Sequence, residues 1–124
     1  MTESTPHPIH AAAAPHYTWG GACDGWRLVE SPDLSVIQER MPPGTSEVRH
    51  RHRRARQFFY VLRGRLAVEC ANLSHVVGPD AGLEIPPLAA HRVFNDSGEV
   101  VEFLVVSQPP SQGDREPVDE EAPT

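Results

Sequence analysis

The chain has 124 residues, a net charge of −6 and 39% hydrophobic residues, which is enough for one domain with a modest core. All eleven basic residues are arginine, which excludes chemistry that needs a lysine, such as Schiff-base formation. No stretch approaches the roughly 20 apolar residues of a membrane span, and the N-terminus lacks the pattern of a secretory signal. Because Cys23 and Cys70 are the only cysteines, we expect a cytoplasmic protein without a disulfide framework.

The two ends of the chain differ in composition from the middle. Residues 1–17 are rich in Pro, Ala, Thr and His, whereas residues 111–124 are acidic and contain Pro. Neither end offers enough apolar surface to offset the entropy lost on ordering, although either could lie over a partner subunit. The sequence therefore predicts a disordered segment at 1–17, a barrel domain at 18–110 and a disordered acidic tail at 111–124.

Clusters of Pro, Gly, Asp and Asn divide the middle of the chain into short apolar runs. Such runs are too short for helices and favour β-strands joined by turns. The predicted strands lie at 26–29, 34–39, 58–62, 66–70, 75–77, 83–85, 91–94 and 100–106. This pattern predicts an all-β sandwich or barrel, with Arg63-Gly64 as a tight hairpin between two strands.

Four polar residues of this barrel suit a metal ion. His50 and His52 are two residues apart, so both imidazoles project from the same face of one strand. Gln57 stands where the next strand begins, and His91 begins a later strand. Three imidazoles and one amide oxygen can surround a divalent transition metal ion, and Fe, Mn, Zn, Ni and Cu all accept imidazole-rich sites. We therefore predict a metal site at His50, His52, Gln57 and His91.

Alternation along the strands also predicts the surroundings of this site. Gln57 shares a face with the next alternate residues of its strand, as His91 does on its own strand. The expected wall of the cavity is mainly apolar and consists of Phe59, Val61, Val93 and Phe103. Such a cavity suits a small apolar molecule with one chelating polar group. The run 100–106 is apolar on both faces, which favours a homodimer in which the outer face is covered.

These motifs resemble those of the cupin superfamily. Gly44, His50, His52 and Gly64 match the spacing of its first motif, while Pro86, His91 and Asn95 match the second. The resemblance spans about residues 26–110 and implies a jelly-roll barrel, or double-stranded β-helix. It also implies a metal bound by the His pair, a motif Glu and the second-motif His, in subunits that commonly form dimers.

Two positions depart from the family pattern. Leu88 stands where the second motif has Gly, which implies that position 88 need not adopt a positive φ. Gln57 stands where the first motif has Glu, and a neutral amide leaves the ion more Lewis acidic than a carboxylate does. The change favours isomerisation, cyclisation, elimination or hydrolysis over oxygen activation. Two roles for Gln57 remain open, as a direct ligand or as a hydrogen-bond partner of a metal-bound water.

Three hypotheses of function follow. The first is a metal-dependent enzyme acting on a small molecule, either by polarising a substrate oxygen or by activating O₂. The second is a non-catalytic cupin that binds or senses a small molecule. The third is a structural partner. The sequence assigns no catalytic residue, since Glu69, Glu84 and Glu102 are not placed in the cavity by alternation.

An arginine-rich stretch offers a further alternative. Arg49, Arg51, Arg53, Arg54 and Arg56 lie within eight residues and could form a nucleic-acid patch. No aromatic residues interleave with them, and alternation places the first three on the face opposite the histidines. We therefore expect no nucleic-acid or membrane partner, and favour an anionic substrate or acidic side chains of a partner subunit as the counterpart of these arginines.

Overall fold

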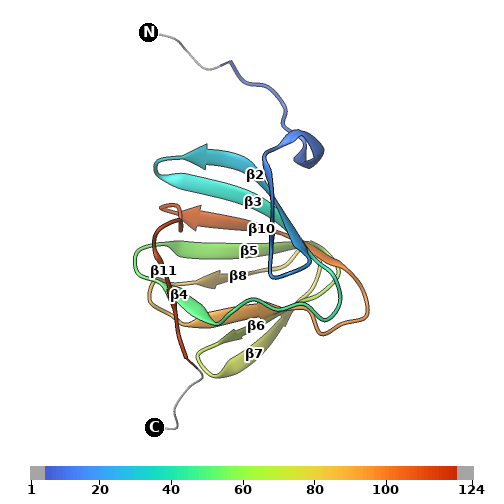
Figure 1. Cartoon of the computed structure of the whole chain (residues 1–124), viewed down its shortest axis with the longest axis vertical. Coiled ribbons are helices and arrows are strands. Elements are labelled where there is room, and N and C mark those ends of the chain that lie inside the picture. The colour runs from blue at the N-terminus through green and yellow to red at the C-terminus, as the bar shows by residue number, and fades with distance from the viewer. Residues whose placement is uncertain (1–4, 120–124) are drawn as a thin grey trace.

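The computed structural model describes residues 5–119, which form two antiparallel β-sheets and a single short 3-10 turn at Ala11–Ala13. The first sheet has six strands in the order β1-β2-β3-β10-β5-β8, most of which follow one another from top to bottom in Figure 1. The second has five, in the order β11-β4-β9-β6-β7. The all-β prediction is confirmed. No helix in this part of the chain is long and apolar enough to cross a membrane.

The strands of the six-stranded sheet are β1 (His16–Trp19), β2 (Cys23–Ser31), β3 (Leu34–Met41), β5 (Arg56–Arg63), β8 (Gly82–Ile85) and β10 (Val101–Gln108). Those of the five-stranded sheet are β4 (His50–His52), β6 (Leu66–Cys70), β7 (Leu73–Val77), β9 (His91–Phe94) and β11 (Arg115–Pro117). Each predicted apolar run falls on one of these strands. The exact ends differ because polar residues extend several strands beyond their apolar centres.

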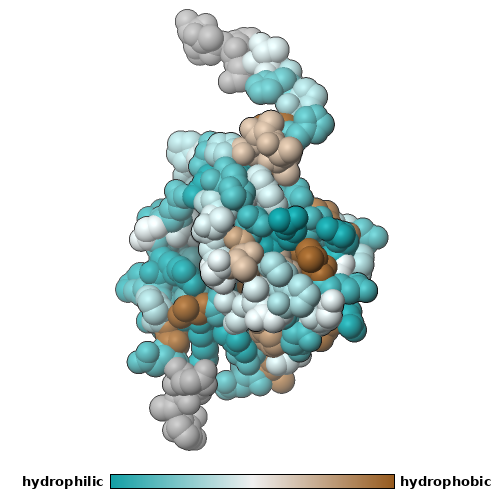
Figure 2. Space-filling model, turned by 45° about the vertical axis from the view of Figure 1, so that its right-hand side comes forward, coloured by the Kyte–Doolittle hydropathy of each residue, from teal (hydrophilic) through white to brown (hydrophobic). Residues whose placement is uncertain are grey.

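The hydrophobic core lies between the two sheets and takes alternate residues from each. Val101, Phe103 and Val105 of β10 are 0%, 0% and 5% exposed, whereas the residues between them are only partly buried. On neighbouring β5, Phe58 and Leu62 face outward and are 40% and 39% exposed. The outer face of these strands is thus apolar as predicted, and a homodimer remains a prediction. On the face shown in Figure 2, hydrophobic residues form separate patches on a mainly hydrophilic surface.

Both segments predicted to be disordered contain β-structure. Strand β1 begins at His16 and pairs with β2, and β11 pairs with β4 at the edge of the other sheet (Figure 1). Composition did not indicate these strands because they depend mainly on backbone pairing and polar contacts, although Trp19 of β1 also packs against the core. Glu116 of β11, for example, pairs with Arg51 at 2.9 Å and with Arg53 at 2.7 Å. The predictions for residues 1–4 and 120–124 lie outside the described residues.

The predicted hairpin at Arg63-Gly64 is wrong. Strand β5 pairs with β10 and β8, whereas β6 pairs with β7 and β9, so the chain passes from one sheet to the other at this turn. Gly64 has a φ of +79°, and a Cβ atom there would overlap the carbonyl oxygen of Val100. The glycine therefore marks a close crossing of two chain segments rather than a two-residue hairpin.

We expect Gly64→Ala to destabilise the protein by about 2–4 kcal/mol, since the new methyl group adds a backbone clash to the cost of a positive φ. Gly44→Ala is the matched control, because Gly44 has a φ of +80° but no atom within 4 Å of its Cβ position. That variant should lose only about 1–2 kcal/mol. Urea unfolding of both variants measures the difference in stability. Equal losses of stability would contradict the close approach of Gly64 to the backbone of Val100.

Candidate metal centre

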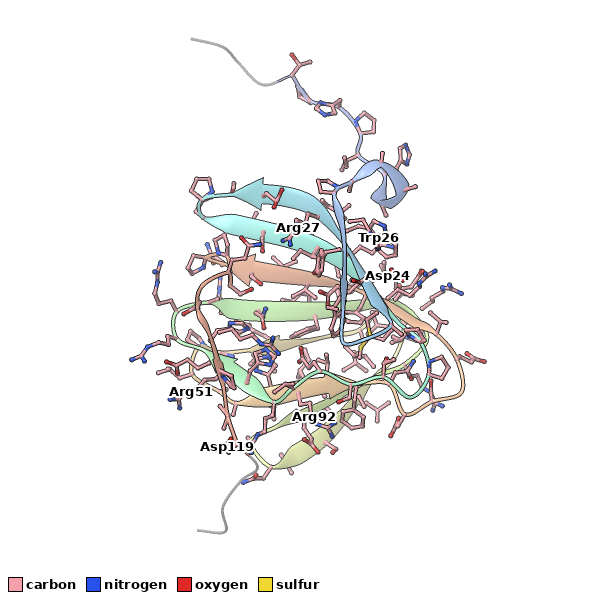
Figure 3. The ribbon with its side chains drawn as sticks, viewed as in Figure 1. Asp24, Trp26, Arg27, Arg51, Arg92 and Asp119 are labelled. Carbon is pink, nitrogen blue, oxygen red and sulfur yellow. The ribbon has the colours of Figure 1, made fainter. Side chains whose placement is uncertain are left out.

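The three predicted histidines meet in the interior of the barrel. His50 and His52 lie on β4, and His91 is paired directly with His50 across the neighbouring strand β9. Their exposed fractions are 4%, 5% and 1%, and one ring nitrogen from each lies within 4.8 Å of the others. The alternation of strand side chains and the register of β4 with β9 together produce this cluster. Figure 3 draws the side chains on the ribbon, many of which fill the space between the two sheets.

The imidazoles are held neutral and oriented by their surroundings. Burial lowers the pKa of His50 to about 3 and of His52 to about 4, and also lowers the pKa of His91. The Nδ1 atoms of His50 and His91 lie 2.8 and 3.0 Å from the backbone oxygens of Val48 and Ala89. If Nδ1 carries the proton in both rings, Nε2 is left as a lone-pair donor for a metal ion.

Gln57 adds an oxygen to this set of nitrogens. Its side chain is 6% exposed, lines the same cavity as His50 and His52, and donates from Nε2 to Ser107 Oγ at 3.1 Å. The Oε1 atom of Gln57 is buried without a hydrogen-bond partner, as are Nδ1 of His52 and Nε2 of His91. Buried polar atoms without partners are costly, so this donor set fits a divalent transition metal ion.

A cavity of about 350 Å³ opens beside the histidines. Of the predicted wall residues only Phe59 lines it, whereas Val61, Val93 and Phe103 are 0%, 1% and 0% exposed and belong to the core. The alternation of strand side chains placed these three residues inside the barrel, as the structure has them. It did not predict how far along the strand each residue lies from the cavity. The register pairs Ser107 with Gln57 and Val105 with Phe59, and places Phe103 opposite Val61, further from the histidines.

The cavity wall is more polar than predicted. It includes Tyr17, Arg27, Glu39, Glu47 and Arg115. The Tyr17 hydroxyl donates to Glu39 Oε2 at 2.6 Å, and the guanidinium of Arg27 stacks on the Tyr17 ring at 4.4 Å from its centroid. Burial raises the pKa of Glu39 to about 7, against the lowering effect of Tyr17 and Arg27, and raises that of Glu47 to about 8. Both carboxyl groups thus titrate near neutral pH.

A sequence model of the cupin domain family matches residues 37–107, more than half of the chain. The chain is a cupin. It is 26% identical over 76 residues to an uncharacterised protein of Methanocaldococcus jannaschii, and it spans 61% of the length of that relative.

Solved structures confirm the double-stranded β-helix. This cupin resembles the polyketide cyclase RemF from Streptomyces resistomycificus with a TM-score of 0.79 and 19% identity, over 94% of this chain and 88% of that one. It resembles a sugar phosphate isomerase of the cupin superfamily from Silicibacter pomeroyi with a TM-score of 0.73 and 20% identity, over 84% of this chain and 76% of that one.

The acidic side of the cavity was not predicted from the sequence. The position of Glu39 could have been predicted, because this residue alternates with Ser35 and Ile37 on β3 and so faces the interior with them. Tyr17 and Arg115 were missed since they lie in the segments predicted to be disordered. The acidic residues considered instead pair with surface arginines: Glu69 with Arg92, Glu84 with Arg56, and Glu102 with Arg63.

Besides strand pairing, hydrogen bonds from Leu88 and to Asp114 hold the strand that carries the histidine pair and the turn after it. The amide of Leu88 donates to the carbonyl of His52 at 2.7 Å. Leu88 has a φ of +73°, so the prediction that this position needs no positive φ is wrong: the leucine adopts the left-handed conformation that the family's glycine would adopt without strain.

On the other side, the Asp114 carboxylate accepts the backbone N–H groups of Arg53, Arg54 and Ala55 at 2.9–3.2 Å. Burial opposes ionisation of Asp114, but these hydrogen bonds outweigh it and lower its pKa.

We expect Asp114→Asn to destabilise this cupin by about 1–3 kcal/mol, because an amide accepts these N–H groups less strongly than a carboxylate. Asp96→Asn, on an exposed side chain, is the control and should change stability by about 0.5 kcal/mol or less. Chemical unfolding measures both variants. Equal stability of the two would show that the carboxylate does not hold the turn after His52.

Proposed function

We propose that this cupin is a metal-dependent enzyme that acts on a small molecule bound in the cavity beside His50, His52 and His91. The observation that carries the proposal is the convergence of three buried imidazoles whose ring nitrogens lie within 4.8 Å of one another. A divalent ion at these residues, whether Fe, Mn, Zn, Ni or Cu, would supply Lewis acidity to a substrate oxygen. Gln57 would either bind the ion through Oε1 or accept a hydrogen bond from water on it.

The neutral donor set favours Lewis-acid chemistry over oxygen activation. Three imidazoles and one amide leave the full charge of the cation uncompensated at the site, which strengthens polarisation and disfavours an oxidised metal. Two structural neighbours are named as a polyketide cyclase and a sugar phosphate isomerase, reactions of this general kind. At 19% and 20% identity, the similarity to these two proteins shows a shared fold. That this cupin catalyses an isomerisation or a cyclisation is part of the proposal.

Glu39 and Glu47 both line this cavity with raised pKa values, and Glu39 is the one whose carboxyl group accepts a hydrogen bond from another side chain of the wall. With a pKa of about 7 its carboxyl group can both accept and release a proton near neutral pH. Tyr17 donates a hydrogen bond to Oε2 and so fixes the orientation of the group. We assign Glu39 as the general acid–base and Tyr17 as the residue that positions it, while the histidines hold the ion.

We expect the protein, purified without an affinity tag or added metal, to contain one equivalent of a single transition metal. His52→Ala should lose it, because one of three imidazole ligands is removed. His75→Ala removes a histidine of β7 that lies outside the cluster and should retain it. Elemental analysis measures all three proteins, with thermal unfolding as a check of the fold.

Retention of the metal in a folded His52→Ala protein would contradict the ligand assignment. A metal-free wild-type protein would instead favour a binding or sensing role. Gln57→Ala separates the two roles of the amide: loss of the ion indicates a direct ligand, and retention indicates a bond to water.

A second prediction concerns the pH dependence of stability. The pKa of Glu39 rises from 4.5 in the unfolded chain to about 7 in the folded protein, so the folded state binds more protons between these values. Its contribution to stability is therefore complete below pH 4.5 and lost as the pH rises through about 7. Glu39→Gln removes this dependence.

The free energy of unfolding of Glu39→Gln, relative to wild type, should therefore increase from pH 5 to pH 8 by on the order of 1–3 kcal/mol. Glu99→Gln, on an exposed side chain, serves as the control and should show no such trend. Urea unfolding at several pH values gives the comparison. Parallel pH profiles of wild type and Glu39→Gln would show that this carboxyl group titrates normally.

A further inference from the structure

A second and larger cavity adjoins the first. It has a volume of about 590 Å³ and lies between the β2–β3 turn, the turn that follows His52, and the segment 109–114. The two cavities have four lining residues in common: Arg27, Ile37, Ser111 and Gln112. Arg27, which Figure 3 labels, comes from β2 and stacks on the ring of Tyr17, a residue that lines the smaller cavity. These shared residues place the larger cavity next to the cavity that His50 and His52 line.

The charged residues of the larger cavity leave an excess of positive charge. Arg27, Arg53 and Arg54 face two acidic residues, Glu30 and Asp114. The Asp114 carboxylate is already occupied by three backbone N–H groups. Glu30 lies 3.8 Å from Arg27 and its side chain is 56% exposed, so water screens the pair.

Arg54 is the arginine whose charge is least compensated. The neighbouring guanidinium of Arg53 is bound to Glu116 at 2.7 Å. Arg54 makes hydrogen bonds to Asp114 only through its backbone N–H, and its guanidinium forms no ion pair with a carboxylate within residues 5–119. Its side-chain donors therefore remain available to a ligand that enters the cavity.

We infer that this cavity is an oxyanion subsite, in which Arg54 and Arg27 bind a carboxylate or phosphate group of the substrate. The inference rests on the proposed function and adds the substrate class: a small molecule with an oxyanion at one end and a reacting oxygen at the other. A guanidinium forms paired hydrogen bonds with either kind of oxyanion. Arg27, which lines both cavities, lies where the bound group would meet the rest of the molecule.

The test is titration calorimetry of the full chain with inorganic phosphate, and in a separate arm with benzoate, which distinguishes phosphate from carboxylate recognition. Arg54→Gln removes the charge and most of the donors. Arg65→Gln is the matched control, because the exposed Arg65 lies beyond the opposite end of the eight-residue strand β5. His52→Ala tests whether the anion depends on the metal centre. Thermal unfolding verifies that each variant is folded.

Wild type and Arg65→Gln should bind at least one of the two anions saturably, and Arg54→Gln should bind it about 10–100-fold more weakly. His52→Ala should bind the anion as wild type does, since the subsite is separate from the histidines. This result supports the subsite even if the metal analysis shows that the proposed function is wrong.

Three results would overturn the inference. One is equal affinity of Arg54→Gln and Arg65→Gln, which would make the binding nonspecific. Another is the absence of saturable binding of both anions to wild type. The third is loss of binding in His52→Ala with retention in Arg54→Gln, which would place the anion at the metal centre.

Discussion

The burial of three uncharged imidazoles is the constraint on which the rest of the site depends. Each buried polar atom without a partner costs about 1–3 kcal/mol, and the structure leaves such atoms on His52, His91 and Gln57. Burial suppresses protonation of the rings and so preserves their lone pairs near neutral pH. The same desolvation that makes these groups unfavourable in an apolar interior therefore makes them good ligands for a cation.

In the proposed function, the groups that would hold the metal ion differ from the group that would transfer a proton. Where the family has a carboxylate in the first motif, this chain has Gln57, whose Nε2 is directed to Ser107. Carboxyl groups are present instead on the cavity wall, at Glu39 and Glu47, where burial raises their pKa values to about 7 and 8. A carboxylate bound to a cation would stay ionised, whereas one on the wall of a partly dry cavity can exchange a proton near neutral pH.

Local pattern predicted the fold and the strand face that carries the clustered histidines, but not the shape of the cavity. The alternation of His50 and His52 and the pattern of apolar runs depend on the pleat of single strands, which a sequence displays directly. The depth of Val61 and Phe103 depends on the register between β5 and β10, and the crossing at Gly64 depends on contact with Val100. These are long-range relations. Polar contacts such as that of Tyr17 with Glu39 could not be predicted either, because they also join residues that are far apart in the sequence.

A segment outside the family-matched region 37–107 helps to hold the histidine cluster in place. Strand β4 has only three residues, and its only direct residue pairing with β9 is that of His50 with His91. Its other edge is covered by β11, where Arg115 pairs with His52 and Pro117 with His50. Without that cover, a short edge strand would be poorly fixed and would expose unpaired backbone groups. The position of the histidines thus depends on the C-terminal segment, which also supplies Ser111 and Gln112 to the walls of both cavities.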